Sequence, residues 1–338
     1  MEKCLVTKLN GAVNDSSLLR IGEIVLELTA NNANTEILEL SGENCEYSCE
    51  QAYVLDTSRV EANVRQNVKN WKPIKSVDAG KYKFHIFNKY KLGAILSKAN
   101  AEKCDGYTFL NSLTELYLKN VDNFNISALE NKTTLKRLQI TGNAGGDIAC
   151  LKALTLLTSL VLSNNVYGDI SALKNLTVLT SLSLQGENIY GDISALKNLT
   201  VLTSLSLQGS LNMVLTSDTM SEIPARSIII GWQSMVGKNF GDLAVMHPNL
   251  CYIDCGSGVT YTWSSRPSSS KIIAIPNKAT MNNIDKMLQD QAQCQVGFTS
   301  SDNTLYKTIT VAGTRTSASD EAVTALQSKG YTVSIAKA

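Results

Sequence analysis

The sequence predicts an α/β solenoid with a parallel sheet, preceded by a small β-rich domain. Residues 167–186 and 190–209 have the same sequence, YGDISALKNLTVLTSLSLQG, displaced by 23 residues. The pattern L-x-x-L-x-L recurs on both sides of this pair. Units of this length contain one short apolar strand each and bury it only by stacking on their neighbours. We place the β-rich domain at residues 1–105 and the solenoid at residues 106–338, with the junction across residues 97–106.

The leucine pattern sets the positions of the first strands. Its units begin at Leu113, Leu135, Leu157, Leu179 and Leu202, so the spacings are 22, 22, 22 and 23. We therefore expect parallel strands centred near residues 117, 139, 161, 183 and 206. The extra residue in the last spacing predicts an insertion at residues 187–188. In the two preceding units, Asn143 and Asn165 occupy the equivalent position.

Each unit returns along the outer face through the pattern G-D-I-x-x-L-x-x-L, at residues 146–154, 168–176 and 191–199. We expect its Ile and Leu side chains to point into the core. Asp147, Asp169 and Asp192 are suited to cap the amides of each short turn. One carboxylate per coil falls short of the six to eight oxygens that calcium binds, so we expect no metal and no cofactor. This period and pattern are typical of a leucine-rich repeat.

The repeat continues more weakly toward the C-terminus. Further strands are expected at residues 225–230, 250–255, 270–275, 306–311 and 331–336. Residues 281–293 and 319–329 show helical spacing, and Gly330 is placed to end the second helix. Because the last predicted element is a strand, the terminal coil requires a cap or a partner.

The first hundred residues do not repeat. Strands are expected at residues 4–9, 21–28, 36–40 and 82–87, separated by polar stretches. Residues 59–71 are predicted to form a helix, because Val60, Val64 and Val68 lie four residues apart.

Composition restricts the classes of partner. The 338 residues include 31 basic and 30 acidic side chains, which argues against nucleic acid as the main partner. No apolar run approaches the ~20 residues needed to cross a bilayer, so we expect no membrane insertion. The first residues, MEKCLVTKLNGAVND, lack the apolar centre of a secretory signal, which predicts a chain that stays in the cytoplasm where it is made.

Chemistry-bearing side chains are sparse. Eight cysteines include Cys45 and Cys49, with no second pair nearby, so free thiols are expected ahead of a zinc site or a Cys45–Cys49 disulfide. Cys150 and Cys255 fall on inward-facing repeat positions. The two histidines, His85 and His247, have no nucleophile or carboxylate at a recognisable spacing. We therefore predict a protein that is not an enzyme and has no catalytic residues.

The outward positions of the strands supply the candidate partner-binding residues. In the middle coils these positions are small and polar, which favours a solvated strip: Thr158, Ser159, Thr180, Ser181, Ser183, Thr203, Ser204 and Ser206. The flanks are richer in the aromatic and Arg side chains that dominate interfaces. They contain Tyr117, Lys136 and Arg137 on one side and Arg226, Trp232, Tyr252 and Asp254 on the other. We favour the second flank; the alternative is that Trp232 and Tyr252 pack on the loop with Tyr261 and Trp263.

Residues 108–338 resemble bacterial leucine-rich repeat proteins, through the units G-D-I-S-x-L-x-x-L-T-x-L-T-S-L-x-L. Residues 309–335, ITVAGTRTSASDEAVTALQSKGYTVSI, and the opening CLVTKLNGAVNDSSLLRIGEI are similar to repeat proteins of Bacteroidales and of the crAss-like bacteriophages that infect them.

This resemblance implies a virion protein for decoration, a fibre or host adhesion, assembled in the bacterial cytoplasm. The N-terminal domain is expected to contact other virion proteins, and the solenoid a host-surface protein or glycan. A homo-oligomer is compatible with this arrangement. The alternative is an intracellular bacterial scaffold that docks a partner protein on the sheet, and its location would be cytoplasmic.

Overall fold

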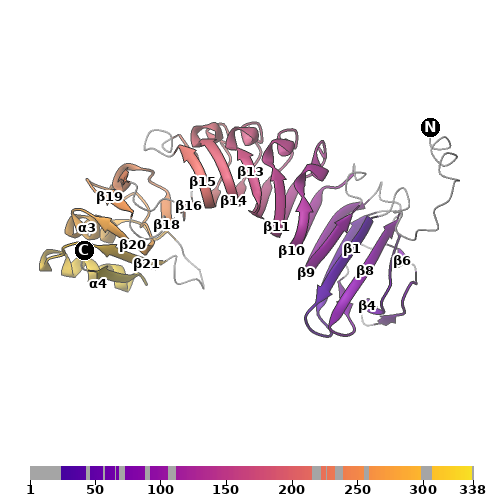
Figure 1. Cartoon of the computed structure of the whole chain (residues 1–338). Coiled ribbons are helices and arrows are strands. Elements are labelled where there is room, and N and C mark those ends of the chain that lie inside the picture. Colours follow the sequence, from indigo (N-terminus) through magenta and orange to yellow (C-terminus); the bar gives the residue numbers. More distant parts are fainter. Residues whose placement is uncertain are drawn as a thin grey trace.

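A computed structural model shows an elongated, curved molecule with a β-rich part at one end and helical coils at the other (Figure 1). The structure describes residues 24–42, 46–55, 58–64, 66–67, 73–87, 92–105, 112–214, 222–225, 227–232, 239–254, 259–297 and 307–336. The predicted strand at residues 4–9 lies outside these ranges. None of the helices in the described segments is both long enough and apolar enough to cross a membrane.

The N-terminal part is a set of antiparallel strands. They are β1 (Ile24–Ala30), β2 (Glu36–Gly42), β3 (Glu46–Cys49), β4 (Tyr53–Leu55), β5 (Ser58–Val60), β6 (Gln66–Asn67), β7 (Ile74–Ser76), β8 (Gly80–Phe87) and β9 (Leu92–Asp105). Strand β8 pairs with β1 and β3, and β9 pairs with β1 and β2. Tyr47, Tyr53 and Phe84 pack their rings together in the core, with centroids 5.9–6.4 Å apart.

The predicted helix at residues 59–71 is wrong. Its described residues contain the end of β5 and the short strand β6, and Asn63 between them has a positive φ of 61°. A residue in this left-handed conformation interrupts a helix. β-Branched side chains such as Val60 and Val64 also favour strands over helices, so their four-residue spacing did not indicate a helical face.

The predicted junction at residues 97–106 is largely strand. β9 runs through it to Asp105 and pairs antiparallel with β1 and β2. The same strand pairs in parallel with the first solenoid strand, β10 (Glu115–Asn125), through Ala94, Ile95 and Leu96. The two parts of the chain therefore share backbone hydrogen bonds.

The leucine pattern forms the parallel sheet that the sequence predicts. Its strands after β10 are β11 (Arg137–Asp147), β12 (Ser159–Asn164), β14 (Ser181–Asp192), β15 (Ser204–Val214), β16 (Ser227–Trp232) and β18 (Leu250–Asp254), with β13 (Val166–Asp169) on the return path. The register aligns Leu116, Leu138, Leu160, Leu182 and Leu205, which are all buried. The register shift between Glu187 and Ile189 confirms the predicted insertion.

The return segments contain short 3₁₀ helices on the outer side of the curve (Figure 1). They are η3 (Ile126–Leu129), η4 (Ile148–Leu151), η5 (Ile170–Leu173), η6 (Ile193–Leu196) and η7 (Leu243–Val245). Asp147, Asp169 and Asp192 each accept a hydrogen bond from the amide two residues on, at 2.8 Å, which confirms their predicted capping role. Asn125 and Asp242 cap in the same way.

The C-terminal coils continue as a second parallel sheet. Its order is β17 (Asn239–Asp242), β19 (Thr260–Thr262), β20 (Ile275–Met281), β21 (Thr308–Ala312) and β22 (Thr332–Ala336). The helices α3 (Ile284–Gln293) and α4 (Asp320–Ser328) pack together, with η9 (Ser317–Ser319) before α4. Both predicted helices are confirmed, and α4 ends before Gly330, whose φ is 84°. Of the strand predicted at residues 270–275, Lys271 and Ala274 form isolated bridges and only Ile275 belongs to β20.

Candidate interaction surfaces

The inner sheet presents its outward side chains in rows, because parallel pairing aligns equivalent positions. One row contains Glu115, Arg137, Ser159, Ser181 and Ser204. The next row contains Tyr117, Gln139, Val161, Ser183 and Ser206. The middle of the sheet is therefore small and mostly polar, as the sequence predicts, and its larger side chains gather at the β10–β11 end.

The threonines of the middle strip have a structural role that the sequence reasoning missed. The hydroxyls of Thr158, Thr180 and Thr203 each donate to a carbonyl of the preceding coil, at 2.9–3.0 Å. The backbone amide of each threonine donates to the same carbonyl at 2.8 Å. These hydrogen bonds link adjacent coils. Because the threonine hydroxyls are already bonded to backbone, the polar groups of the strip that are left for a partner are those of the serines. The available sequence signal was a Thr one residue after the first leucine in three successive units, those that begin at Leu157, Leu179 and Leu202.

The β10–β11 flank is accessible. Arg137 has 54% of its side chain exposed, and its guanidinium lies 3.8 Å from the carboxylate of Glu115. Lys136 is also exposed and Tyr117 is half-buried. An exposed ion pair of this kind contributes little to stability, so these charges are available to a partner.

On the opposite flank, the two candidates whose side chains the structure describes, Tyr252 and Asp254, are less exposed than the sequence predicts. Tyr252 is only 6% exposed, and its hydroxyl donates to Asp254, which is half-buried, at 3.3 Å. The expected exposure of Tyr252 is therefore wrong: nearly all of β18 is buried, so its outward positions are covered. Arg226 and the side chain of Trp232 lie outside the described residues.

Tyr261 and Trp263, the expected packing partners of that flank, are both buried. The Trp263 indole donates to Asp290 at 3.0 Å. The two rings thus belong to the core of the C-terminal coils.

The two histidines have different surroundings. His247 is buried; its Nε2 donates to the carbonyl of Ile223 at 2.9 Å and its Nδ1 accepts from the amide of Asn249 at 3.0 Å. Burial lowers the pKa of His247, so the neutral ring acts as a structural link. His85 lies 2.8 Å from Glu50, which also contacts Lys83 at 3.0 Å. Hydrogen bonds from these two side chains lower the pKa of Glu50.

Arg266 organises the same buried region as His247. Its guanidinium donates to backbone carbonyls, which are those of Ala244, His247, Pro248, Leu250 and Lys271, at 2.9–3.3 Å. Burial lowers the pKa of Arg266 to about 10. The side chain thus holds together segments from several coils.

Four cysteines whose side chains the structure describes are free thiols. Cys49, Cys251 and Cys294 are buried, and the half-buried Cys150 donates to the carbonyl of Ile126 at 3.4 Å. Burial raises the pKa of Cys49 to about 11 and that of Cys150 to about 12, which makes both poor nucleophiles. Cys45 and Cys255 lie outside the described residues. Within the described ranges, no three His, Cys, Asp or Glu side chains gather as a metal site would require.

A row of exposed aliphatic side chains crosses three successive coils, and the sequence reasoning missed it. Leu156, Val178 and Val201 are 49%, 41% and 48% exposed. Each precedes the first leucine of its unit, and an exposed lysine lies four residues earlier, at Lys152, Lys174 and Lys197. We call these six residues the lateral stripe. The signal was available in the sequence, as an apolar residue at one outward position of each repeat.

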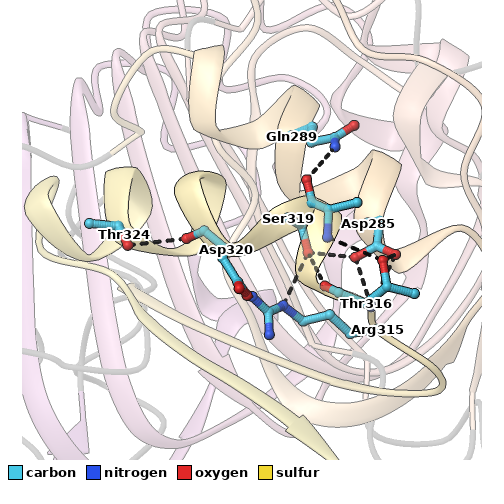
Figure 2. Close-up of polar contacts among 8 residues, drawn as sticks. Asp285, Gln289, Arg315, Thr316, Ser319, Asp320 and Thr324 are labelled. Atoms are coloured by element: carbon cyan, nitrogen blue, oxygen red, sulfur yellow. Dashed lines mark hydrogen bonds and ion pairs between the residues drawn. The ribbon is translucent and has the colours of Figure 1, made fainter.

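A polar network joins α3 to the start of α4 (Figure 2). The carboxylate of Asp285 accepts hydrogen bonds from the amide and hydroxyl of Thr316 and from the hydroxyl of Ser319. The bonds from Ser319 and Thr316 lower the pKa of Asp285. Arg315 forms an ion pair with Asp320 and donates to Ser319, which fixes the loop after β21.

An open cavity of about 670 Å³ lies beside this loop. It is lined by residues 313–315 and 336 and by Val323, Val333 and Ile335. The cavity thus lies on the end face of the terminal coil, next to β22.

No family model and no curated protein matches the chain. Among solved structures it is similar to the leucine-rich repeat ectodomain of the Arabidopsis thaliana receptor kinase GASSHO1/SCHENGEN3, in complex with CASPARIAN STRIP INTEGRITY FACTOR 2. Identity is 20% and the TM-score 0.46, over 67% of this chain and 28% of that one. An internalin (inlF) of Listeria monocytogenes is 17% identical, with a TM-score of 0.43, over 72% of this chain and 80% of that one. Internalin C2 of the same species is 16% identical, with a TM-score of 0.28, over 47% and 73%.

Proposed function

We propose that the chain is a non-enzymatic binding protein of a bacteriophage virion, where it serves in decoration, a fibre or host adhesion. In this proposal residues 1–105 contact other virion proteins, and residues 106–338 display the solenoid to a host-surface protein or glycan. The repeat units support a binding role. We base the virion assignment on the resemblance that the sequence analysis drew between both ends of the chain and repeat proteins of crAss-like bacteriophages.

The observation that best supports a binding role is the lateral stripe. Coils stack ~4.8 Å apart, so Leu156, Val178 and Val201 form a continuous apolar line. Core packing does not require an aliphatic side chain at these outward positions, and aligned exposed apolar residues mark interaction sites. Lys197 pairs with Glu222 at 3.3 Å. The exposed Lys152 and Lys174 suit a partner whose apolar contact surface is bordered by acidic groups.

A second candidate function is an intracellular bacterial scaffold that docks a partner protein on the inner sheet. The accessible Tyr117, Lys136 and Arg137 at the β10–β11 flank favour it, because Arg and Tyr side chains are enriched at protein interfaces.

Mass spectrometry of purified particles distinguishes the two functions. Particles are separated from host lysate on a density gradient, and the chain is quantified against the major capsid protein. We expect it to co-sediment with particles at a fixed ratio to the capsid protein. Its absence from particles, combined with its presence in the soluble host fraction, would contradict the virion role and favour the scaffold.

A further inference from the structure

Strands β16 and β18 form a short and irregular pairing, which we call the β16–β18 seam. The register aligns Ile228 with Leu250 and then shifts, so that Ile229 lies opposite Tyr252. By contrast, β14 pairs with β15 along residues 181–192. Fewer backbone hydrogen bonds hold the seam than hold that regular pair of coils. Side-chain hydrogen bonds across the seam therefore contribute a larger share of its stability.

Two side chains of the coil that contains β18 cross the seam to carbonyls of the preceding coil. The buried ring of His247 donates from Nε2 to the carbonyl of Ile223 at 2.9 Å. The side-chain amide of Asn249 donates to the carbonyl of Ala225 at 2.9 Å. The backbone amide of Asn249 donates in turn to Nδ1 of His247 at 3.0 Å. The ring makes both of its bonds only when it is neutral, because a protonated Nδ1 is no longer an acceptor.

The described surroundings of His247 do not compensate a positive charge on its ring. The guanidinium of Arg266 donates to the carbonyl of His247 itself at 2.9 Å, which brings a buried cation close to the ring. The nearest acidic side chains are already engaged elsewhere. Glu222, next to Ile223 in the chain, pairs with Lys197 at 3.3 Å. Asp242 accepts hydrogen bonds from two backbone amides.

The other titratable side chains on the adjoining segments also leave the ring uncompensated. The thiol of Cys251 donates to a backbone carbonyl at 3.3 Å, and the ammonium of Lys271 lies 3.5 Å from another. Asp254, toward the end of β18, accepts from a tyrosine hydroxyl. Burial lowers the pKa of His247, and the charge of Arg266 lowers it further. The closed seam therefore favours the neutral ring.

We propose that the β16–β18 seam is an acid-sensitive joint, which is closed while His247 is neutral and opens when the ring takes up a proton. Protonation makes Nδ1 a donor that faces the amide of Asn249, and it places a second cation near Arg266. Opening brings the ring into water, where it titrates at about pH 6.5. The contribution of the neutral ring is complete above that pH. It is lost as the pH falls further, through the folded-state pKa.

Hydrogen–deuterium exchange of the full-length chain at neutral pH and at about pH 5 tests the joint, with rates corrected for intrinsic exchange. Peptides from β16 and β18 should exchange up to about 25-fold faster at the lower pH, because the ring takes up its proton chiefly in the open seam. Peptides from residues 159–192 should exchange equally at both pH values. No acceleration at the seam, or an equal acceleration along the whole chain, overturns the proposal.

His247→Asn is the decisive variant. Its side-chain oxygen can accept from the amide of Asn249, and the side chain cannot take up a proton. The corrected exchange of its β16 and β18 peptides should therefore be the same at both pH values. His85→Asn is the matched control, because it removes the other of the two histidines and leaves the seam unchanged. This control should keep the full response to acid.

A response to acid that persists in His247→Asn, or that disappears in His85→Asn, overturns the proposal. If the seam of His247→Asn is already open at neutral pH, His247→Gln replaces it, because its amide nitrogen can donate to the carbonyl of Ile223. The expectation is the same for this variant. If its seam is open as well, His85→Asn decides alone, since His247 is then the single histidine in the chain. Seam exchange in this protein that does not respond to acid overturns the proposal.

Discussion

At the scale of single residues, the coils are held in place by polar side chains that bind the backbone. The capping aspartates satisfy amides at the start of each 3₁₀ turn, and Arg266 satisfies carbonyls from several coils. A buried polar group without a hydrogen-bond partner raises the free energy of the folded state. Each of these side chains therefore stabilises the fold by bonding backbone groups of other residues.

Removing one cap should weaken the solenoid measurably. Asp169→Ala leaves the amide of Ser171 without its 2.8 Å acceptor, and we expect the free energy of unfolding to fall by about 1 kcal/mol. Urea denaturation followed by circular dichroism measures the change. Asn175→Ala, an exposed position of the same coil, is the control and should differ from the unmodified chain by less than about 0.5 kcal/mol. Equal midpoints for Asp169→Ala and the control contradict the capping role.

Arg266→Lys should be strongly destabilising even though it keeps the charge. Lysine has a single nitrogen and cannot reach carbonyls on several sides, so buried acceptors such as those of Ala244 and Leu250 lose their donor. We expect a loss of about 2 kcal/mol or more in the same denaturation experiment. The exposed Arg59→Lys is the matched control and should be close to neutral. A neutral Arg266→Lys would show that the guanidinium geometry is not needed.

The Asp285 network should make the terminal coils sensitive to acid. Hydrogen bonds from Ser319 and Thr316 lower the pKa of Asp285 below its usual value of 3.8. Its stabilising contribution is therefore complete above the unfolded-state pKa and is lost as the pH falls through the folded-state pKa. Asp285→Asn should melt earlier than the unmodified chain at neutral pH, and the difference should shrink below about pH 4. Melting curves between neutral and acidic pH, with Glu321→Gln as control, test this; a difference that persists at low pH contradicts it.

At the scale of elements, the leucine spacing predicted β10, β11, β12, β14, β15, β16 and β18, and the G-D-I pattern predicted the capped turns. These predictions succeeded because both patterns recur with little change. Helical spacing of apolar residues predicted both C-terminal helices, but it failed at residues 59–71, where valine spacing was ambiguous between strand and helix. The sequence reasoning also failed at Tyr252, because the alternation between inward and outward positions does not reveal that nearly all of β18 is buried.

The lateral stripe gives a test of the proposed binding surface at this scale. The double variant Val178→Asp/Val201→Asp should reduce partner binding, measured as incorporation into particles or as affinity for an identified partner, by about 2 kcal/mol. Its melting should not change, because both side chains are nearly half exposed. Thr177→Asp/Thr200→Asp places the same charges on neighbouring exposed residues and is the control. Unchanged binding in the valine variant moves the site to the β10–β11 flank or the N-terminal part.

At the scale of the whole molecule, β9 couples the N-terminal part to the solenoid. It pairs with β1 and β2 on one side and with β10 on the other, so neither part has a complete sheet without it. From the sequence we expect residues 97–106 to be only a connection between the two parts. A strand shared by two sheets has no repeat pattern that would reveal it.

Residues 106–338 alone should therefore be less stable than the full chain. The truncation removes β9 and leaves an open β10 edge beside Leu116, which is buried in the full chain. We expect an earlier melting transition and concentration-dependent association in size-exclusion chromatography. Residues 92–338, which keep β9, are the matched comparison and should recover part of the loss. Identical melting of the shorter fragment and the full chain would show that the two parts are independent.

The stacking of coils has a mechanical consequence. Hydrogen bonds between coils run along the long axis of the molecule, so tension applied to its two ends loads every interface in series. β14 and β15 pair along almost their whole length, whereas β16 and β18 pair only over residues 228–231, with an irregular register. Beyond β18, its pairing to the next coil in this sheet is the isolated bridge between Tyr252 and Ala274. Under a pulling force the molecule should therefore open first on either side of β18, while the coils built from identical units remain intact.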